Sequence, residues 1–306
     1  MRIVETITDI QTANPHVFTV LENIGEVPIY HENYKVRHPF AAYNTSLASV
    51  SSRILRVLDA LDEVQNIRGF DSPKSEDWEV SLLEATDHML DSLMEHMEDC
   101  SGIIRSFFPD SKNSKFRKTL KNYDKSVAPY RDYIGKIVNY MKHNQGRLRS
   151  ISFSWQQGSS LGYFVEGPQN DGGIGPVAGI HKNEATAFSF YRNIPFHICN
   201  IYAVSRRLSV ALHEIDSRLK PQKAKKSNEK QSNLSMALQR ASNLPNIYFD
   251  DEIKMGVPFI KFTSNSIKID CPSQKVKATT IPGGANVSVS YNGDGATRTY
   301  KIPYYT

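Results

Sequence analysis

Polar and basic side chains between residues 132 and 149 have the spacing of a site that could act on phosphate groups. Four of them recur at intervals of four, three and four residues: Asp132, Lys136, Asn139 and His143. On a helix this spacing places them on one stripe. Three further cations extend the group: Lys142, Arg147 and Arg149. A neutral imidazole at His143 could act as general base toward a ribose hydroxyl, while the cations stabilise negative charge that develops on phosphorus.

The same stretch has a second interpretation that needs no ligand. Lys and His side chains near the C-terminus of a helix interact favourably with the helix dipole and hydrogen-bond to its free carbonyl groups. The sequence leaves both interpretations open. The catalytic one requires His143 to lie, open to solvent, at the mouth of a positively charged groove on which its cationic neighbours converge.

A second candidate pair is found in "RNIPFH", where Arg192 and His197 are five residues apart. Pro195 and the alternating pattern before it predict that Arg192 lies outside the helix that carries His197. The alternative is a buried polar pair or a helix cap. Catalysis by these residues requires that both side chains converge in a cleft.

A helical segment that ends in "VNYMKHN" resembles the HEPN superfamily, which includes abortive-infection and RNA-cleaving proteins. The resemblance covers about residues 41–149. Nuclease members carry an Arg, usually followed by a polar residue, and a His four to six positions after the Arg. Matching His143 and Asn139 to this pattern puts Val138 at the Arg position, whereas Arg192, Asn193 and His197 keep the letters. The resemblance implies RNA or protein binding, metal-independent RNA cleavage, a homodimer formed through the bundle, and a role in phage defence.

Charge is distributed unevenly along the chain. Residues 75–104 contain nine acids and no Lys or Arg, whereas residues 112–149 contain eleven bases and two acids. The two segments either neutralise each other within one bundle, or the basic one faces an external polyanion such as RNA. Bases and aromatics alternate in "KFRKTLKNYDKSVAPYRDY", and aromatic rings can stack on unpaired bases.

One face of the acidic segment has the spacing of a metal site: Glu84, His88, Asp91 and Glu95. A di-metal bundle needs a second helix of this kind, and the sequence offers none, so we expect no metal. Neither a phosphate-binding glycine motif nor the pattern of a Ser or Cys nucleophile occurs, so no cofactor is predicted.

Composition predicts a cytoplasmic globular protein. The chain has 306 residues, of which 40% are hydrophobic and 23% charged. It lacks an apolar run near 18 residues, and Glu5 and Asp9 interrupt the region where a signal peptide would be apolar, so we expect no membrane partner. The three cysteines are far apart in sequence, which suits a reducing compartment.

Periodicity predicts an α+β fold. Helices are expected over 41–66, from about Ser75, over 126–144 and over 193–219; a hairpin over 148–167; and strands over 185–192 and after residue 246. We expect a helical bundle (1–146), a hairpin and strands with a long helix (147–219), a basic linker with a short helix (220–244) and a β-rich module (245–306). "YNGDGAT" predicts a further hairpin turn.

Two functions follow from these patterns. One is an HEPN-like protein that binds RNA through Lys136, Asn139, Lys142, Arg147 and Arg149, with His143, Arg192 and His197 as candidate catalytic residues. The other is a non-catalytic adaptor whose acidic helix and C-terminal β-module dock other proteins. Val138 in place of the Arg favours a protein without catalysis; any enzyme would be a metal-independent ribonuclease.

Overall fold

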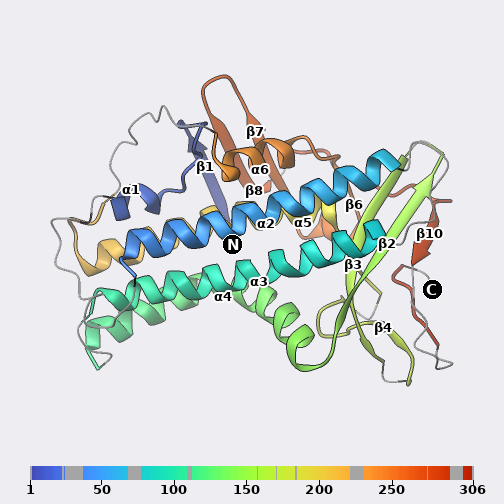
Figure 1. Ribbon diagram of the computed structural model, residues 1–306, viewed down its shortest axis with the longest axis horizontal. Helices are drawn as coiled ribbons and strands as arrows, with labels where there is room; N and C mark the ends of the chain where they lie inside the picture. The colour runs from blue at the N-terminus through green and yellow to red at the C-terminus, as the bar shows by residue number, and fades with distance from the viewer. Residues whose placement is uncertain are drawn as a thin grey trace.

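Four long helices lie side by side and form the body of the molecule (Figure 1). They are α2 (Pro39–Ile67), α3 (Asp77–Ser106), α4 (Ser114–His143) and α5 (Phe190–Ile215). The computed structural model describes residues 2–22, 24, 37–67, 77–108, 112–156, 158–169, 171–182, 185–220, 231–273, 275–289 and 299–304. The helix predicted over 41–66 is confirmed as α2, whose apolar stripe, including Val50, Ile54 and Leu61, is buried. The acidic helix is confirmed as α3.

Helix α4 is longer than the sequence pattern predicted. The prediction began at residue 126, whereas the helix begins at Ser114, where the side chain of Asn113 caps it by accepting a hydrogen bond from the Phe116 backbone N–H at 3.1 Å. Its buried stripe starts at Phe116 and continues through Tyr123. The many bases of the first turns hid this stripe, and the helix continues through Pro129, which normally disfavours a helix interior.

The predicted hairpin is confirmed as β2 (Arg147–Trp155) and β3 (Gly158–Pro168), which pair antiparallel from Arg147–Glu166 to Trp155–Gly158. The sheet has the order β10-β2-β3-β4, with β4 at Ile174–Pro176, β10 at Asn286–Val289, and the two-residue β5 (Phe188–Ser189) also on β3. The middle and C-terminal strands therefore belong to one sheet, which lies at one end of the helical bundle (Figure 1).

Helix α5 begins earlier than predicted, and this changes the position of Arg192. The strand expected over 185–192 is reduced to β5, because Ser189 caps α5 and the helix begins at Phe190. Arg192 therefore lies inside the helix together with His197, and the prediction that it lies outside was wrong. The helix is buried along most of its length, and α4, α1, α6 and both main sheets contact it.

A second sheet has the order β1-β8-β7 and pairs the N-terminal strand with strands from residues 257–273. The first strand was not predicted, although "IVETI" alternates as an edge strand would. Elements from all four predicted sequence ranges share one main hydrophobic core, and the α+β class is confirmed. The remaining elements are β1 (Ile3–Ile7), α1 (Val17–Glu22), α6 (Asn233–Ser242), β6 (Ile247–Tyr248), α7 (Asp250–Lys254), β7 (Val257–Phe262), β8 (Ile267–Ser273) and β9 (Thr279–Thr280).

Two predictions concern residues outside the described ranges. The hairpin turn of "YNGDGAT" and most of the basic linker, residues 221–230, lie outside the described residues. Within the described parts, none of the helices combines the length and the apolar character needed to cross a membrane.

Candidate nucleic-acid interface

The C-terminal end of α4 borders a groove that also involves α3 and β2. His143 is the last residue of α4 and is exposed. The groove has a volume of about 320 Å³, a floor of apolar side chains including Leu83 and Met141, and five charged residues in its lining. These charged residues are Glu84, Asp87, Asp91, Lys142 and Arg147. Three carboxylates face two cations, and His143 is not part of the lining. This groove is therefore not the positively charged one that the catalytic interpretation of His143 requires.

Acidic residues set the electrostatics of this groove. Burial raises the pKa of Asp87, and the neighbouring Asp91 carboxylate raises it further. Lys142 binds Asp91, with Nζ 3.0 Å from Oδ1, and this hydrogen bond raises the pKa of Lys142. The acidic and basic segments of the sequence thus meet here and neutralise each other in part. A phosphate group entering the groove would encounter excess negative charge.

Replacing Lys142 with alanine should change little. Its side chain is 55% exposed, and exposed ion pairs contribute roughly 0–1 kcal/mol. We expect the free energy of unfolding of the variant to stay within about 1 kcal/mol of wild type in urea titrations. The affinity for RNA should also stay within about twofold, since Asp91 already occupies the ammonium group. A tenfold loss of RNA affinity would instead place Lys142 in the interface.

The two arginines after α4 do not converge with His143. Arg149 forms an ion pair with Glu166 in the neighbouring strand, with Nε 2.6 Å from Oε2 and both side chains about nine-tenths buried. Arg147 is exposed at the start of β2. The structure therefore brings Lys142 and Arg147 to one groove, joins Arg149 to the sheet, and leaves His143 on the surface of the helix end.

The pair Arg192 and His197 belongs to a buried polar network between α4, α5 and β3. His197 has no exposed surface, and its Nδ1 lies 2.9 Å from the Tyr130 hydroxyl. Its Nε2 lies 2.8 Å from Oδ1 of Asn193. The Tyr163 hydroxyl donates to the same oxygen at 2.7 Å, and the Asn193 amide donates to the Tyr133 hydroxyl at 3.0 Å.

These contacts determine which ring nitrogen of His197 carries the proton. Since Asn193 Oδ1 can only accept, Nε2 of His197 must donate, and in a neutral ring Nδ1 then accepts from Tyr130. Burial and, to a smaller extent, the neighbouring Arg192 charge lower the pKa of His197 to about 3. The ring is therefore neutral, both of its nitrogens are hydrogen-bonded, and none of its surface is exposed.

Arg192 is also held by structural contacts. Its Nε and Nη2 donate to the carbonyl oxygen of Gly256 at 3.1 and 2.9 Å, and its guanidinium lies over the Phe196 ring, 5.2 Å from the centroid. The side chain is 6% exposed. Arg192 and His197 share a helix, but their polar groups are directed to separate partners.

Two arrangements that the sequence did not reveal bring reactive side chains together. His96 and Cys100 lie one turn apart on α3, with Nε2 3.8 Å from Sγ, and Ser46 contacts the other ring nitrogen at 2.9 Å. Burial raises the pKa of the Cys100 thiol to about 12 and lowers that of His96 to about 4, so the pair is neutral and inert. Cys199 and Cys271, which are far apart in sequence, also interact. In the described regions, no three His, Cys, Asp or Glu side chains are grouped to bind a metal.

Exposed lysines occupy one face of α4, which we call the α4 lysine face: Lys118, Lys121, Lys125 and Lys136. Their spacing of three, four and eleven residues keeps them on one side of the helix. Each is exposed, and none forms an ion pair within the described parts of the chain. Of these four lysines only Lys136 was predicted to contact RNA. Lys118, Lys121 and Lys125 come before residue 126, where the helix was predicted to begin.

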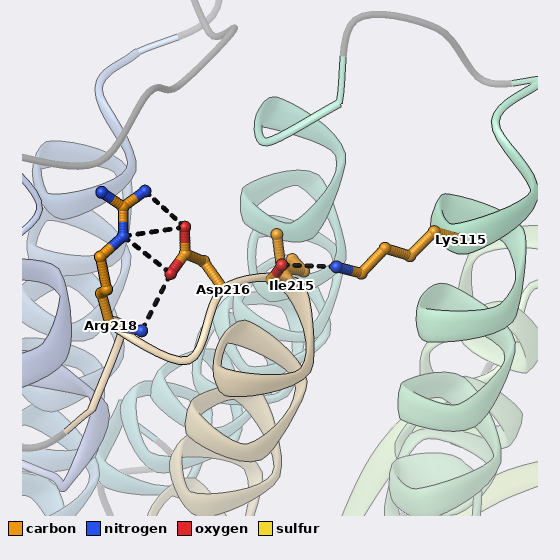
Figure 2. A network of polar contacts seen from close by, with 4 residues as sticks. All are labelled: Lys115, Ile215, Asp216 and Arg218. Atoms are coloured by element: carbon orange, nitrogen blue, oxygen red, sulfur yellow. Dashed lines mark hydrogen bonds and ion pairs between the residues drawn. The ribbon is translucent and has the colours of Figure 1, made fainter.

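The bases in the first turn of α4 run against the helix dipole. Cations are favourable near the C-terminus of a helix, as Lys142 and His143 are, and unfavourable near the N-terminus. The first turns of α4 nevertheless carry bases and no acid. One base is accounted for: Nζ of Lys115 donates to the Ile215 carbonyl oxygen at the end of α5, at 2.7 Å (Figure 2). Beside it Arg218 pairs with Asp216 and lowers the pKa of that carboxyl to about 2. The lysines at 118, 121 and 125 have no comparable internal role.

Comparison of the chain with protein-family models, with curated proteins and with solved structures finds no match. Among these candidate residues, the lysines of the α4 lysine face are exposed and accessible to a ligand.

Proposed function

We propose that this protein binds RNA through the α4 lysine face and does not cleave it. The observation that carries the proposal is the set of four exposed lysines on one helix face, none of which forms an ion pair within the described residues. Lysines that neutralise phosphates release condensed counterions, and this release supplies most of the affinity of sequence-independent binding to nucleic acid.

The geometry favours a binding function over ribonuclease activity. Metal-independent cleavage needs a base within reach of the ribose hydroxyl and cations around the phosphate. His143 is exposed, but its nearest charged groove is acidic, and Arg149 is held by Glu166. His197 and Arg192 are buried in separate contacts. A cytoplasmic role in phage defence forms part of the proposal and rests only on the HEPN resemblance.

Reversing three lysines tests the proposal. The variant Lys118→Glu, Lys121→Glu, Lys125→Glu removes three phosphate contacts and adds three repulsive charges to the same face. We expect its affinity for a fluorescein-labelled RNA to fall at least about tenfold at 100 mM salt, measured by fluorescence anisotropy. The side chains are exposed, so circular dichroism and the thermal midpoint should change little.

A matched control distinguishes loss of the α4 lysine face from a change in the total charge of the protein. Lys261, Lys268 and Lys277 are exposed on and after the β7–β8 hairpin. Their replacement with Glu changes the total charge by the same amount, and it should alter RNA affinity less than about threefold at the same salt concentration. Equal loss in both variants would mean that RNA responds to overall charge and that the α4 lysine face is no interface. Absence of binding in the wild-type protein would refute the proposal outright.

The acidic face of α3 favours a second function, that of an adaptor for a basic protein. Its exposed acids are Glu84, Glu95, Glu98 and Asp99, and grooves of about 290 and 320 Å³ flank this helix.

The same face could meet the α4 lysines of a second copy, in line with the homodimer that the resemblance implies. Sedimentation velocity of wild type and of Glu95→Lys, Glu98→Lys at low salt tests this, with a dimer expected only in the wild type.

A further inference from the structure

We infer that the α4 lysine face recognises the phosphate backbone of a double helix and not the bases of a single strand. This inference rests on the proposed RNA-binding function and adds the class of RNA. It depends on which side chains of α4 are exposed, and which are buried.

The aromatic rings of α4 are buried or partly buried: the partly buried Tyr133 packs against Phe188 and Phe196, and the partly buried Tyr140 lies against Gly146 and Gly167. In the sequence they alternate with bases, but in the structure Phe116, Tyr123 and Tyr130 are buried in the core while the lysines face outward. Large hydrophobic side chains that are exposed in the described residues are Val4, Val80, Val210 and Met255, none of them aromatic and none on α4. Single-stranded nucleic acid is normally bound by a positive groove combined with aromatic stacking on successive bases. The α4 lysine face provides charge without that platform.

The lysines instead suit a dense and rigid array of phosphates. Lys118, Lys121 and Lys125 span seven residues, or about 10 Å of helix axis. A duplex carries about one charge per 1.7 Å of its own axis over both strands, so several phosphates lie within reach of such a segment without rearrangement of the nucleic acid. A single strand has about half that charge density and loses conformational freedom when it is fixed along a helix.

Acidic residues limit how far the duplex can extend over this surface. Toward its C-terminus α4 is flanked by the carboxylates of α3, and Asp91 already holds Lys142. Like charge would repel the duplex from that end. The contact is therefore expected to involve about four phosphates, one for each lysine of the α4 lysine face.

The number of phosphates that the lysines contact determines how steeply the association constant falls with salt. For a duplex the logarithm of the association constant falls by about 0.9 per contacted phosphate for each tenfold rise in salt, and for a single strand by about 0.7. Four contacts give a slope of about −3.6, which corresponds to a loss of affinity of about 150-fold between 50 and 200 mM salt. Replacing Lys136 with Glu should reduce the magnitude of the slope by about one contact.

The experiment uses the full chain with three labelled probes: an RNA duplex of about 20 base pairs, an unstructured oligouridine of the same length, and anionic phospholipid vesicles. We expect the duplex to bind more tightly than oligouridine at every salt concentration, with a slope near −3.6 that the triple Lys→Glu variant abolishes. Equal or tighter binding of oligouridine, lost in the same variant, would overturn the duplex inference and leave RNA binding intact. Binding of neither RNA at 50 mM salt, or of vesicles alone, would overturn both.

Discussion

Replacing Glu252 with alanine should lower the free energy of unfolding by about 3–5 kcal/mol. This glutamate lies on α7, is 1% exposed, and joins α7 to the start of α5. Its Oε1 accepts from the Ser189 backbone N–H at 2.9 Å, while Oε2 accepts from the Phe249 backbone N–H at 3.1 Å and from the Ser189 hydroxyl. Alanine would leave both buried backbone N–H groups without a partner. Chemical denaturation at constant pH measures the loss.

Two further variants make this prediction specific. Glutamine should not rescue the site, because either orientation of its amide places an NH₂ group against one of the two backbone N–H donors. Asp250→Ala changes an exposed acid of the same short helix and should cost less than about 1 kcal/mol. If Glu252→Gln were as stable as wild type, the carboxylate would not be the group that holds α7 and α5 together.

The pH dependence of this contact has a definite sign. Burial raises the pKa of Glu252 from 4.5 to about 7, so the folded protein binds this proton more tightly than the unfolded chain does. The contribution of the group to stability is therefore fully present below pH 4.5 and is lost as the pH rises through 7. The gap between wild type and Glu252→Ala should accordingly be larger at pH 5 than at pH 8.

Much of the fold followed from periodicity because the long helices bury continuous stripes. Helix α2 matches its prediction to within two residues at each end, and the β2–β3 hairpin alternates as a half-buried sheet does. The errors arose where tertiary contacts overrode local signals. Phe190 and Tyr191 have high strand propensity, yet they are the first two residues of α5, because Ser189, held by Glu252, caps the helix directly before them.

Long-range pairing could not be predicted at all. Strand β1 is a five-residue segment near the N-terminus, and its partner β8 is more than 250 residues away in sequence. Similarly, β10 pairs with β2 across more than 130 residues. A local pattern specifies which face of a strand is apolar, but it carries no information about which other strand covers its edge.

The candidate site shows the same division between local and tertiary information. The stripe from Asp132 to His143 was correctly placed on one helix, but its charge depends on α3, which comes from another part of the chain. The letters of Arg192, Asn193 and His197 fit a nuclease pattern, whereas the structure directs all three into packed contacts. Three lysines of the α4 lysine face were present in the sequence as a basic run, and only the true start of α4 places them on one exposed side.

The contribution of the buried network around His197 to the free energy of unfolding should depend on pH. We expect His197→Gln to lower the free energy of unfolding by about 2 kcal/mol at pH 7.5, because glutamine retains polar atoms but loses the ring contacts with Tyr130 and Phe196. Burial lowers the pKa of His197 from 6.5 to about 3, so the unfolded chain binds this proton more tightly. The contribution is present above pH 6.5 and lost as the pH falls. Between pH 7.5 and 5 wild type should therefore lose about 2 kcal/mol that the variant does not lose.

Urea titrations of wild type and His197→Gln at pH 7.5 and pH 5 measure how far their free energies of unfolding approach each other. His213→Gln, an exposed position on the same helix, serves as the control and should stay within about 0.5 kcal/mol of wild type at both. RNA affinity at pH 7.5 should be the same in all three proteins, since the network does not contact the α4 lysine face. A gap that stays constant with pH would mean that His197 is not held neutral. A ribonuclease activity in wild type that His197→Gln abolishes, while the fold is retained, would show that substrate reaches this buried ring.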